Sequence, residues 1–259
     1  MSLSVLLAAM KSEWIKLRTV RSTMWGLGIT VLLTIGIGAL LTSARVSRWD
    51  RMGIGQRLIF EPIGFTLNGI FLSQLAIGVL GVLVMTSEYS TGQIRATFAA
   101  IPTRGTVLLA KIKVFGLVSL VVGLVSTFLA FLIGSQILSS RIHVSLGDSG
   151  ALRCIIGGAI YLTGIGLLGL GLGAILRRTA GAIAALVALV MILPQLAQLL
   201  PSPWDTDVTK YLPGPAGQVL FHLSSNRPSL STGVGLLVFL AYPAVALLIG
   251  WVLLRRRDA

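Results

Sequence analysis

Six long apolar segments dominate this chain, and none of them contains a charged residue or a histidine. They cover residues 24–43, 63–86, 114–138, 154–176, 180–200 and 233–254. A helix rises 1.5 Å per residue, so about 20 apolar residues cross the roughly 30 Å hydrocarbon layer of a bilayer. The sequence therefore predicts an all-α, polytopic membrane protein with six transmembrane helices.

The absence of charge inside these segments limits the possible energy sources. Proton relays and most ion-coupling sites need titratable side chains at membrane depth. Charged residues make up only 11% of the chain, and 55% of it is hydrophobic, which leaves little material for a soluble catalytic domain. We therefore expect no catalytic site in this chain, and any uphill transport should be driven by a partner.

Basic residues flank the apolar segments and account for the net charge of +13. With both termini inside, thirteen Lys and Arg fall in inner segments and eight in outer loops. This excess favours cytoplasmic termini, because positive residues are retained on the cytoplasmic side. No basic stretch carries a nucleic-acid motif, so we expect no nucleic-acid partner.

The residues before the first span are predicted to form an amphipathic helix over 3–22. One face would carry most of the apolar side chains, at helical spacing, and basic residues flank it. Such a helix lies in the headgroup plane of a membrane. We thus divide the chain into a connecting helix, 1–23, and a six-helix transmembrane domain, 24–259. The apolar face consists of Leu3, Leu6, Leu7, Met10, Trp14 and Leu17.

The connector between the second and third spans has the strongest local signals. Ser90 and Gln93 match a capping box, in which both side chains satisfy free N–H groups at a helix start. Pro102 and Gly105 then predict its end. A short helix over 91–100 is expected. Its apolar face would be formed by Ile94, Phe98 and Ile101.

The last outer connector, 201–232, admits two interpretations. Residues 216–223 have helix-like apolar spacing, so this part could return into the outer leaflet where protein covers its backbone. An ordinary surface loop fits the sequence equally well.

Several motifs point away from catalysis. Gly164, Gly166 and Gly169 match G-x-G-x-x-G, but the pattern lies inside the fourth apolar segment and lacks the acidic residue that follows in dinucleotide sites. The many glycines of this segment instead predict close helix packing. The chain contains no Gly-Lys pair and therefore no P-loop. His143, His222 and Cys154 are isolated, so no metal site is expected.

Three stretches together resemble bacterial ABC-2 type permease subunits of ABC exporters. They are residues 12–25 before the first span, residues 88–111 around the predicted short helix, and the weaker match at 211–221. The resemblance extends over essentially the whole chain. It implies a half-transporter that pairs with a second, identical or homologous permease and docks two ATPase subunits, which would bind the ATP and Mg²⁺.

The resemblance also implies roles for individual residues. The coupling segment that contacts the ATPase would include Glu88, Ser90, Gly92, Gln93, Arg95, Phe98 and Arg104. The connecting helix would contribute Glu13, Trp14, Lys16, Arg18 and Arg21. The second and fifth spans would line the transport path, with Asn68, Phe71, Gln74, Met191 and Gln195 as candidate residues.

The leading hypothesis is an exporter subunit in the bacterial cytoplasmic membrane, acting on an amphipathic or hydrophobic cargo such as an antibiotic, peptide or lipid. A role in multidrug or antibiotic resistance would follow from such a cargo. The spans present apolar walls with few polar groups, which favours this cargo class. Two alternatives stay open: an ion-coupled secondary transporter, with a site built from unwound helices, and a non-transporting scaffold or sensor subunit.

Overall fold

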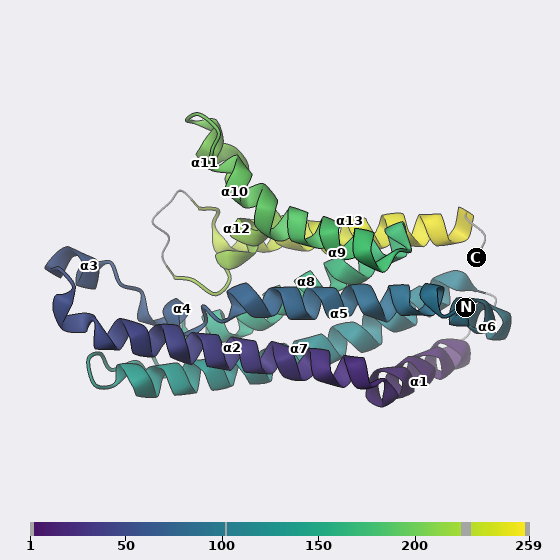
Figure 1. Ribbon diagram of the computed structural model, residues 1–259, viewed down its shortest axis with the longest axis horizontal. Helices are drawn as coiled ribbons and strands as arrows, with labels where there is room; N and C mark the ends of the chain where they lie inside the picture. The colour runs from purple at the N-terminus through teal and green to yellow at the C-terminus, as the bar shows by residue number, and fades with distance from the viewer. Residues whose placement is uncertain (1–2, 102, 224–228, 257–259) are drawn as a thin grey trace.

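The computed structural model describes residues 3–101, 103–223 and 229–256, and these residues form helices joined by turns and loops. Six helices in the described ranges are long and apolar enough to cross a membrane. They run side by side along the long axis of the molecule (Figure 1). The prediction of an all-α polytopic membrane protein is therefore confirmed.

The spans agree with the apolar segments, with some changes at their ends. Helix α2 (Arg21–Ser47) is the first span, α5 (Ile70–Ser90) the second, α7 (Arg104–Leu138) the third and α8 (Ala151–Leu176) the fourth. The fifth is a composite of α9 (Thr179–Val187), the π-helical turn η2 (Ala188–Ile192) and α10 (Leu193–Ala197), and the sixth is α13 (Thr232–Arg256).

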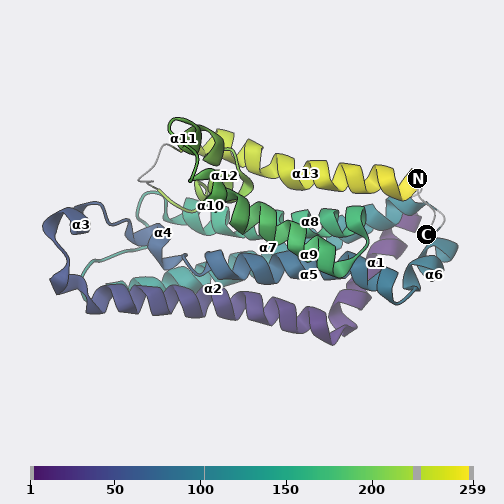
Figure 2. The same ribbon diagram turned by 45° about the horizontal axis from the view of Figure 1, so that its top comes forward.

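Short helices occupy the connectors. At the N-terminal end of the chain, α1 (Leu3–Thr19) is separated from α2 by Val20 alone. At one end of the bundle lie η1 (Trp49–Arg51), α3 (Ile54–Leu58), α4 (Pro62–Thr66), α11 (Trp204–Thr209) and α12 (Pro213–Gln218). At the other end lie α1, α6 (Gln93–Ala100) and the two chain ends (Figures 1 and 2). Below, the end of the bundle that carries α6 is called the α6 end, and the opposite end, which carries α3, is called the α3 end.

The third span begins ten residues before the apolar segment that predicted it. Helix α7 starts at Arg104 and has 35 residues, about 52 Å at 1.5 Å per residue. This is longer than the roughly 30 Å hydrocarbon layer requires. The helix therefore includes Lys111 and Lys113, which lie before the apolar segment. These lysines were expected in a connector.

The start of the second span is broken. Residues 63–66 belong to α4, and Leu67, Asn68 and Gly69 form turns before α5 begins at Ile70. The break has a packing reason: a Cβ at Gly69 would lie 2.0 Å from the carbonyl oxygen of Thr34 in α2. The backbones of α2 and this turn are in direct contact.

Helix α8 is the centre of the bundle and packs against α5, α7 and α13. Its glycines allow backbone contact with α5, because Gly166 faces Gly81 and Gly169 faces Gly78. A Cβ at Gly81 would lie 2.0 Å from the Gly166 carbonyl oxygen, and one at Gly169 would lie 2.1 Å from the Gly78 carbonyl oxygen. The predicted packing role of these glycines is confirmed.

The outer connector returns into the bundle. In α12, Pro213, Gly214, Ala216 and Gly217 are buried, and a Cβ at Gly217 would lie 2.4 Å from the ring of Tyr161 in α8. A simple surface loop therefore does not describe residues 213–221, which pack against the bundle through Pro213, Ala216 and Phe221. Residues 224–228 of this connector lie outside the described residues.

We predict that Gly81→Ala destabilises the protein, because the added methyl group must push α5 away from α8. Overpacking of this kind costs about 1–3 kcal/mol, which should lower the apparent melting temperature in detergent by several degrees. Scanning fluorimetry of the purified chain measures the shift.

Gly36→Ala is the matched control, since no atom lies within 4 Å of a Cβ at Gly36. Equal melting temperatures for the two variants would contradict the packing role of Gly81.

Candidate functional site

A cluster of four charged residues lies at the α6 end, where α1, α5 and α7 meet. Lys111 of α7 lies at its centre, with Nζ 2.8 Å from Glu13 Oε2 and 2.7 Å from Glu88 Oε1. Lys16 of α1 makes a second pair of contacts, at 2.8 Å to Glu13 Oε1 and 2.7 Å to Glu88 Oε1. We call these four residues the charge cluster.

Three members of the charge cluster are shielded from solvent, and Lys16 is partly exposed at its edge. Lys111 is 1% exposed, and Glu13 and Glu88 are each 4% exposed. Two ammonium groups face two carboxylates, so the buried charges balance. Burial opposes the charged form of Lys16, but its hydrogen bonds to Glu13 and Glu88 outweigh this, and the pKa of Lys16 is raised above its ordinary value. Lys16 is therefore charged at neutral pH.

The cluster joins three helices that are far apart in sequence. A buried charge that loses its partner is strongly destabilising, by about 3–5 kcal/mol, so α1, α5 and α7 are held together at this end. Apolar contacts add to this: Leu6 and Ala9 of α1 pack with Ala110 of α7 and with Ile101, which follows α6. The helices beside α6 thus form one connected unit.

The sequence interpretation did not find this cluster. The sequence predicts a place for Glu88 in the coupling segment, for Glu13 in the connecting helix and for Lys111 in a connector, with no contact between them. One signal was available: among the described residues, Glu13 and Glu88 are the only acidic residues at a strongly basic end. Because buried charges need partners of opposite sign, two carboxylates among many cations at one end indicate ion pairs with those cations.

The connecting helix forms but ends at Thr19, so Arg21 belongs to α2 and not to this helix. Only part of its predicted apolar face packs against the bundle. Leu6 and Leu17 are buried against the bundle together with Glu13. Leu3, Leu7 and Trp14 are exposed, at 71%, 57% and 50%. The contact with α7 selects the face that carries Glu13, because only that face brings a carboxylate to Lys111. Arg18 and Arg21 are exposed, and Lys16 is partly buried.

The capping box prediction is wrong. Ser90 is the last residue of α5 and its hydroxyl donates to the Ser87 carbonyl at 3.0 Å. The N-cap of α6 is Gly92, in a left-handed conformation with φ +72°, and no side chain caps the helix. A sharp glycine turn separates α5 from α6, so no room remains for the reciprocal Ser–Gln bonds.

Helix α6 projects at this end with a buried and an exposed face. Ile94 is 3% exposed and anchors the helix to the bundle, whereas Gln93 and Ala96 are exposed. The side chains of Arg95 and Phe98 lie outside the described residues, as does Pro102. Gly105 belongs to α7 and does not end α6. Arg104 starts α7, and its Nη1 donates to the Leu254 carbonyl at 3.1 Å.

The second connection at the α6 end is a tight turn at Arg177 and Arg178. Arg177 follows α8 in a left-handed conformation, with φ +54°. This allows α9 to start at Thr179, whose hydroxyl donates to Thr86 Oγ1 of α5 at 2.9 Å. The start of the fifth span is thereby tied to the second.

The candidate path residues do not share one environment. Gln74 is buried in α5, where its Nε2 donates to the Phe71 carbonyl at 2.8 Å and its Oε1 accepts from the Tyr161 hydroxyl. Phe71 and Gln195 are exposed, and Asn68 and Met191 are partly exposed. The structure thus places Gln74 as a link between α5 and α8, away from the exposed surface that Phe71 reaches.

A comparison with protein-family models matches residues 9–195 to the ABC-2 family transporter proteins. This chain belongs to the ABC-2 family. The match begins within α1, covers α6 and ends in α10. No individual curated protein matched the sequence. As an ABC-2 protein, the chain is a membrane transport subunit of an ABC transporter.

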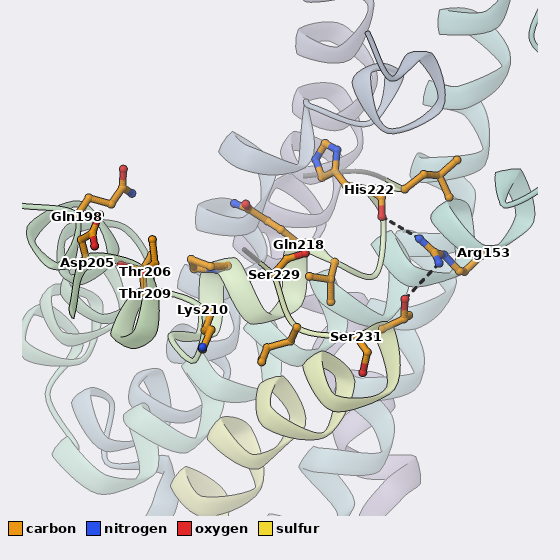
Figure 3. A pocket seen from close by; sticks show the side chains of 15 residues that line it. Arg153, Gln198, Asp205, Thr206, Thr209, Lys210, Gln218, His222, Ser229 and Ser231 are labelled. Carbon is orange, nitrogen blue, oxygen red and sulfur yellow. Dashed lines mark hydrogen bonds between the residues drawn. The ribbon is translucent and has the colours of Figure 1, made fainter. Parts of the chain in front are cut away.

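At its α3 end, the ABC-2 protein has a polar pocket of about 400 Å³ between α8, α10, α11 and α12 (Figure 3). Arg153 borders the pocket and donates to the His222 carbonyl at 2.9 Å and to Thr232 Oγ1 at 3.2 Å. Glu61 holds the same connector, because its Oε1 accepts from the Leu223 N–H at 3.0 Å and its Oε2 contacts His222 Nδ1 at 3.0 Å. Arg153 of α8 and Glu61, the residue before α4, therefore hold the outer connector against the bundle at this end.

We predict that Lys111→Met destabilises the protein strongly, because Glu13 and Glu88 would keep their negative charges in a buried site with Lys16 alone. The expected loss is about 3–5 kcal/mol, seen as a large drop in melting temperature in detergent.

Lys113→Met is the matched control, since Lys113 is exposed on the same helix. Equal melting temperatures for the Lys111→Met and Lys113→Met variants would show that the charge cluster does not hold the three helices together.

Proposed function

We propose that this chain is the membrane subunit of an ABC exporter, which moves an amphipathic or hydrophobic cargo such as an antibiotic, a peptide or a lipid. Two ATPase subunits would drive it, and a second permease, identical or homologous, would complete the transport path. The α6 end would face the cytoplasm of a bacterial cell, with both termini inside. Resistance to the exported compound is the expected cellular result.

One observation carries the mechanism: α6 projects from the end at which the charge cluster joins α1, α5 and α7. A force on α6 would reach α5 through the Gly92 turn, and α1 and α7 through Ile101, which packs with Leu6, Ala9 and Ala110. Since Lys111 couples α5 and α7 to α1, all three would move as one rigid body. Rigid-body motion between two packed states is a common form of conformational switching.

The proposed ATPase contact consists of the exposed faces of α6 and α1. At this end the surface is basic, with Arg18, Arg21 and Arg178 exposed. The acidic groups of the described residues here, Glu13 and Glu88, are engaged in the charge cluster. An ATPase surface with exposed carboxylates would complement this charge pattern.

Glu88 belongs to the charge cluster and therefore has a structural role besides its proposed role in coupling. Removing its carboxylate would disturb Lys111 and the fold, so a Glu88→Ala, Arg95→Ala double variant cannot separate coupling from stability. Changes on the exposed face of α6 can make that separation.

We predict that Ala96→Glu reduces ATPase association and transport without changing the melting temperature. The new carboxylate would face the acidic ATPase surface without a positive partner, which should weaken the contact. Because Ala96 is exposed, the change should not disturb the packing of the bundle. Co-purification from detergent with the ATPase subunits, together with ATP-driven transport in vesicles, measures the two effects.

Ala44→Glu is the matched control, because Ala44 is exposed near the end of α2 at the α3 end. Normal ATPase association of the Ala96→Glu variant would show that α6 is not part of the ATPase contact.

Two other outcomes would support the alternative functions. Cargo uptake driven by an ion gradient without nucleotide would support secondary transport, and ATPase association without any transport would support a sensor subunit.

We predict that Asn68→Leu changes the cargo preference. Asn68 is partly exposed in the turn before α5, where it adds polarity to an otherwise apolar surface. Comparing initial transport rates for a polar and an apolar cargo in the same vesicles measures the change, and an unaltered rate ratio would show that Asn68 only packs.

A further inference from the structure

A groove of about 1130 Å³ lies on the outside of the bundle at the α6 end, between the first turns of α7 and the last turns of α13. Its walls are apolar along the helices. They are formed by Leu108, Leu109 and Ile112 of α7 and by Leu247 and Leu248 of α13.

The rim of the groove is basic. Arg104 and Arg255 both line it, and no acidic residue does. Arg104 is fixed by its bond to the Leu254 carbonyl, and the Arg255 guanidinium lies over the Trp251 ring, 4.8 Å from its centroid. A Cβ at Gly105 would lie 2.5 Å from Trp251 Nε1, so this glycine allows the indole to enter the groove beside both arginines.

We propose that this groove binds an anionic phospholipid of the surrounding bilayer. One acyl chain would lie along the leucines, and the phosphate would lie between Arg104 and Arg255. Three features select this ligand: the apolar walls fit hydrocarbon, the two guanidinium groups complement a phosphate, and Trp251 is of the type that marks the headgroup level.

The position of the groove agrees with this ligand. It lies where two membrane spans reach the end of the bundle, and the arginines are at the ends of the spans, as expected for headgroup contacts. A soluble acidic peptide would meet the arginines but not the apolar walls, and a zwitterionic lipid would fill the walls but gain less from the arginines. The bound lipid would brace α7 against α13 beside α6.

Native mass spectrometry of the delipidated full-length chain in detergent tests the proposal. Phosphatidylglycerol and phosphatidylcholine with the same acyl chains are the two probes. We expect preferential binding of phosphatidylglycerol, and the Arg104→Gln, Arg255→Gln variant should lose this preference, by about fivefold for each arginine.

The Arg18→Gln, Arg178→Gln variant is the matched control, because it removes two exposed arginines of the same end that do not line the groove. It should keep the preference. Equal phosphatidylglycerol binding by the two double variants would overturn the proposal.

A second pair of variants leaves both arginines in place. Ala244 lines the groove and is exposed, so Ala244→Trp should fill it and reduce binding of both lipids, whereas Val245→Trp, on an exposed position outside the lining, should not. Equal lipid binding by these two variants would also overturn the proposal. Competition by glycerol phosphate as strong as by phosphatidylglycerol would show an anion site without a lipid groove.

Discussion

Backbone contact between α8 and its neighbours is the constraint on which the bundle depends. In a bilayer, apolar side chains gain little by leaving lipid for protein, so helices associate through close packing. Gly166 and Gly169 of α8 meet Gly81 and Gly78 of α5 at distances that exclude any side chain. A Cβ at Gly171 would lie 2.8 Å from Ala246 Cβ of α13, and one at Gly157 would lie 2.1 Å from the Leu220 carbonyl oxygen after α12. Close contacts with α5, α13 and the end of the outer connector thus all depend on this one helix.

The charge cluster adds a different kind of constraint at one end. Close packing fixes distances between helices, but it allows them to slide or rotate together. Ion pairs between Lys111 and two carboxylates from other helices fix the register of α1, α5 and α7 beside α6. The glycine contacts and the charge cluster divide the molecule into a rigid centre and a rigid corner at the α6 end. A proposed push on α6 would act on that corner as a whole.

Several site predictions from the sequence differ from the structure for a common reason. Ser90 and Gln93 satisfied a local helix-start pattern, yet the chain turns at Gly92 because α5 continues through Ser90 to carry Glu88 to Lys111. Leu3, Leu7 and Trp14 belonged to a plausible apolar face of α1, yet α7 contacts the face that carries Glu13. In both cases a contact with a distant segment outweighed a local preference, and single-segment patterns hold no information on such contacts.

The sequence by itself determined the six spans, the all-α class, the amphipathic start, the packing role of the α8 glycines and the absence of a P-loop. These follow from hydrophobic length, helical periodicity and residue size, which are local properties. Only the tertiary structure decided that Lys111, Glu13 and Glu88 form a buried cluster, that Gln74 bonds to Tyr161, and that α7 and α13 enclose a basic-rimmed groove. Each of these joins residues far apart in the chain, and their pairing depends on how the helices pack in three dimensions.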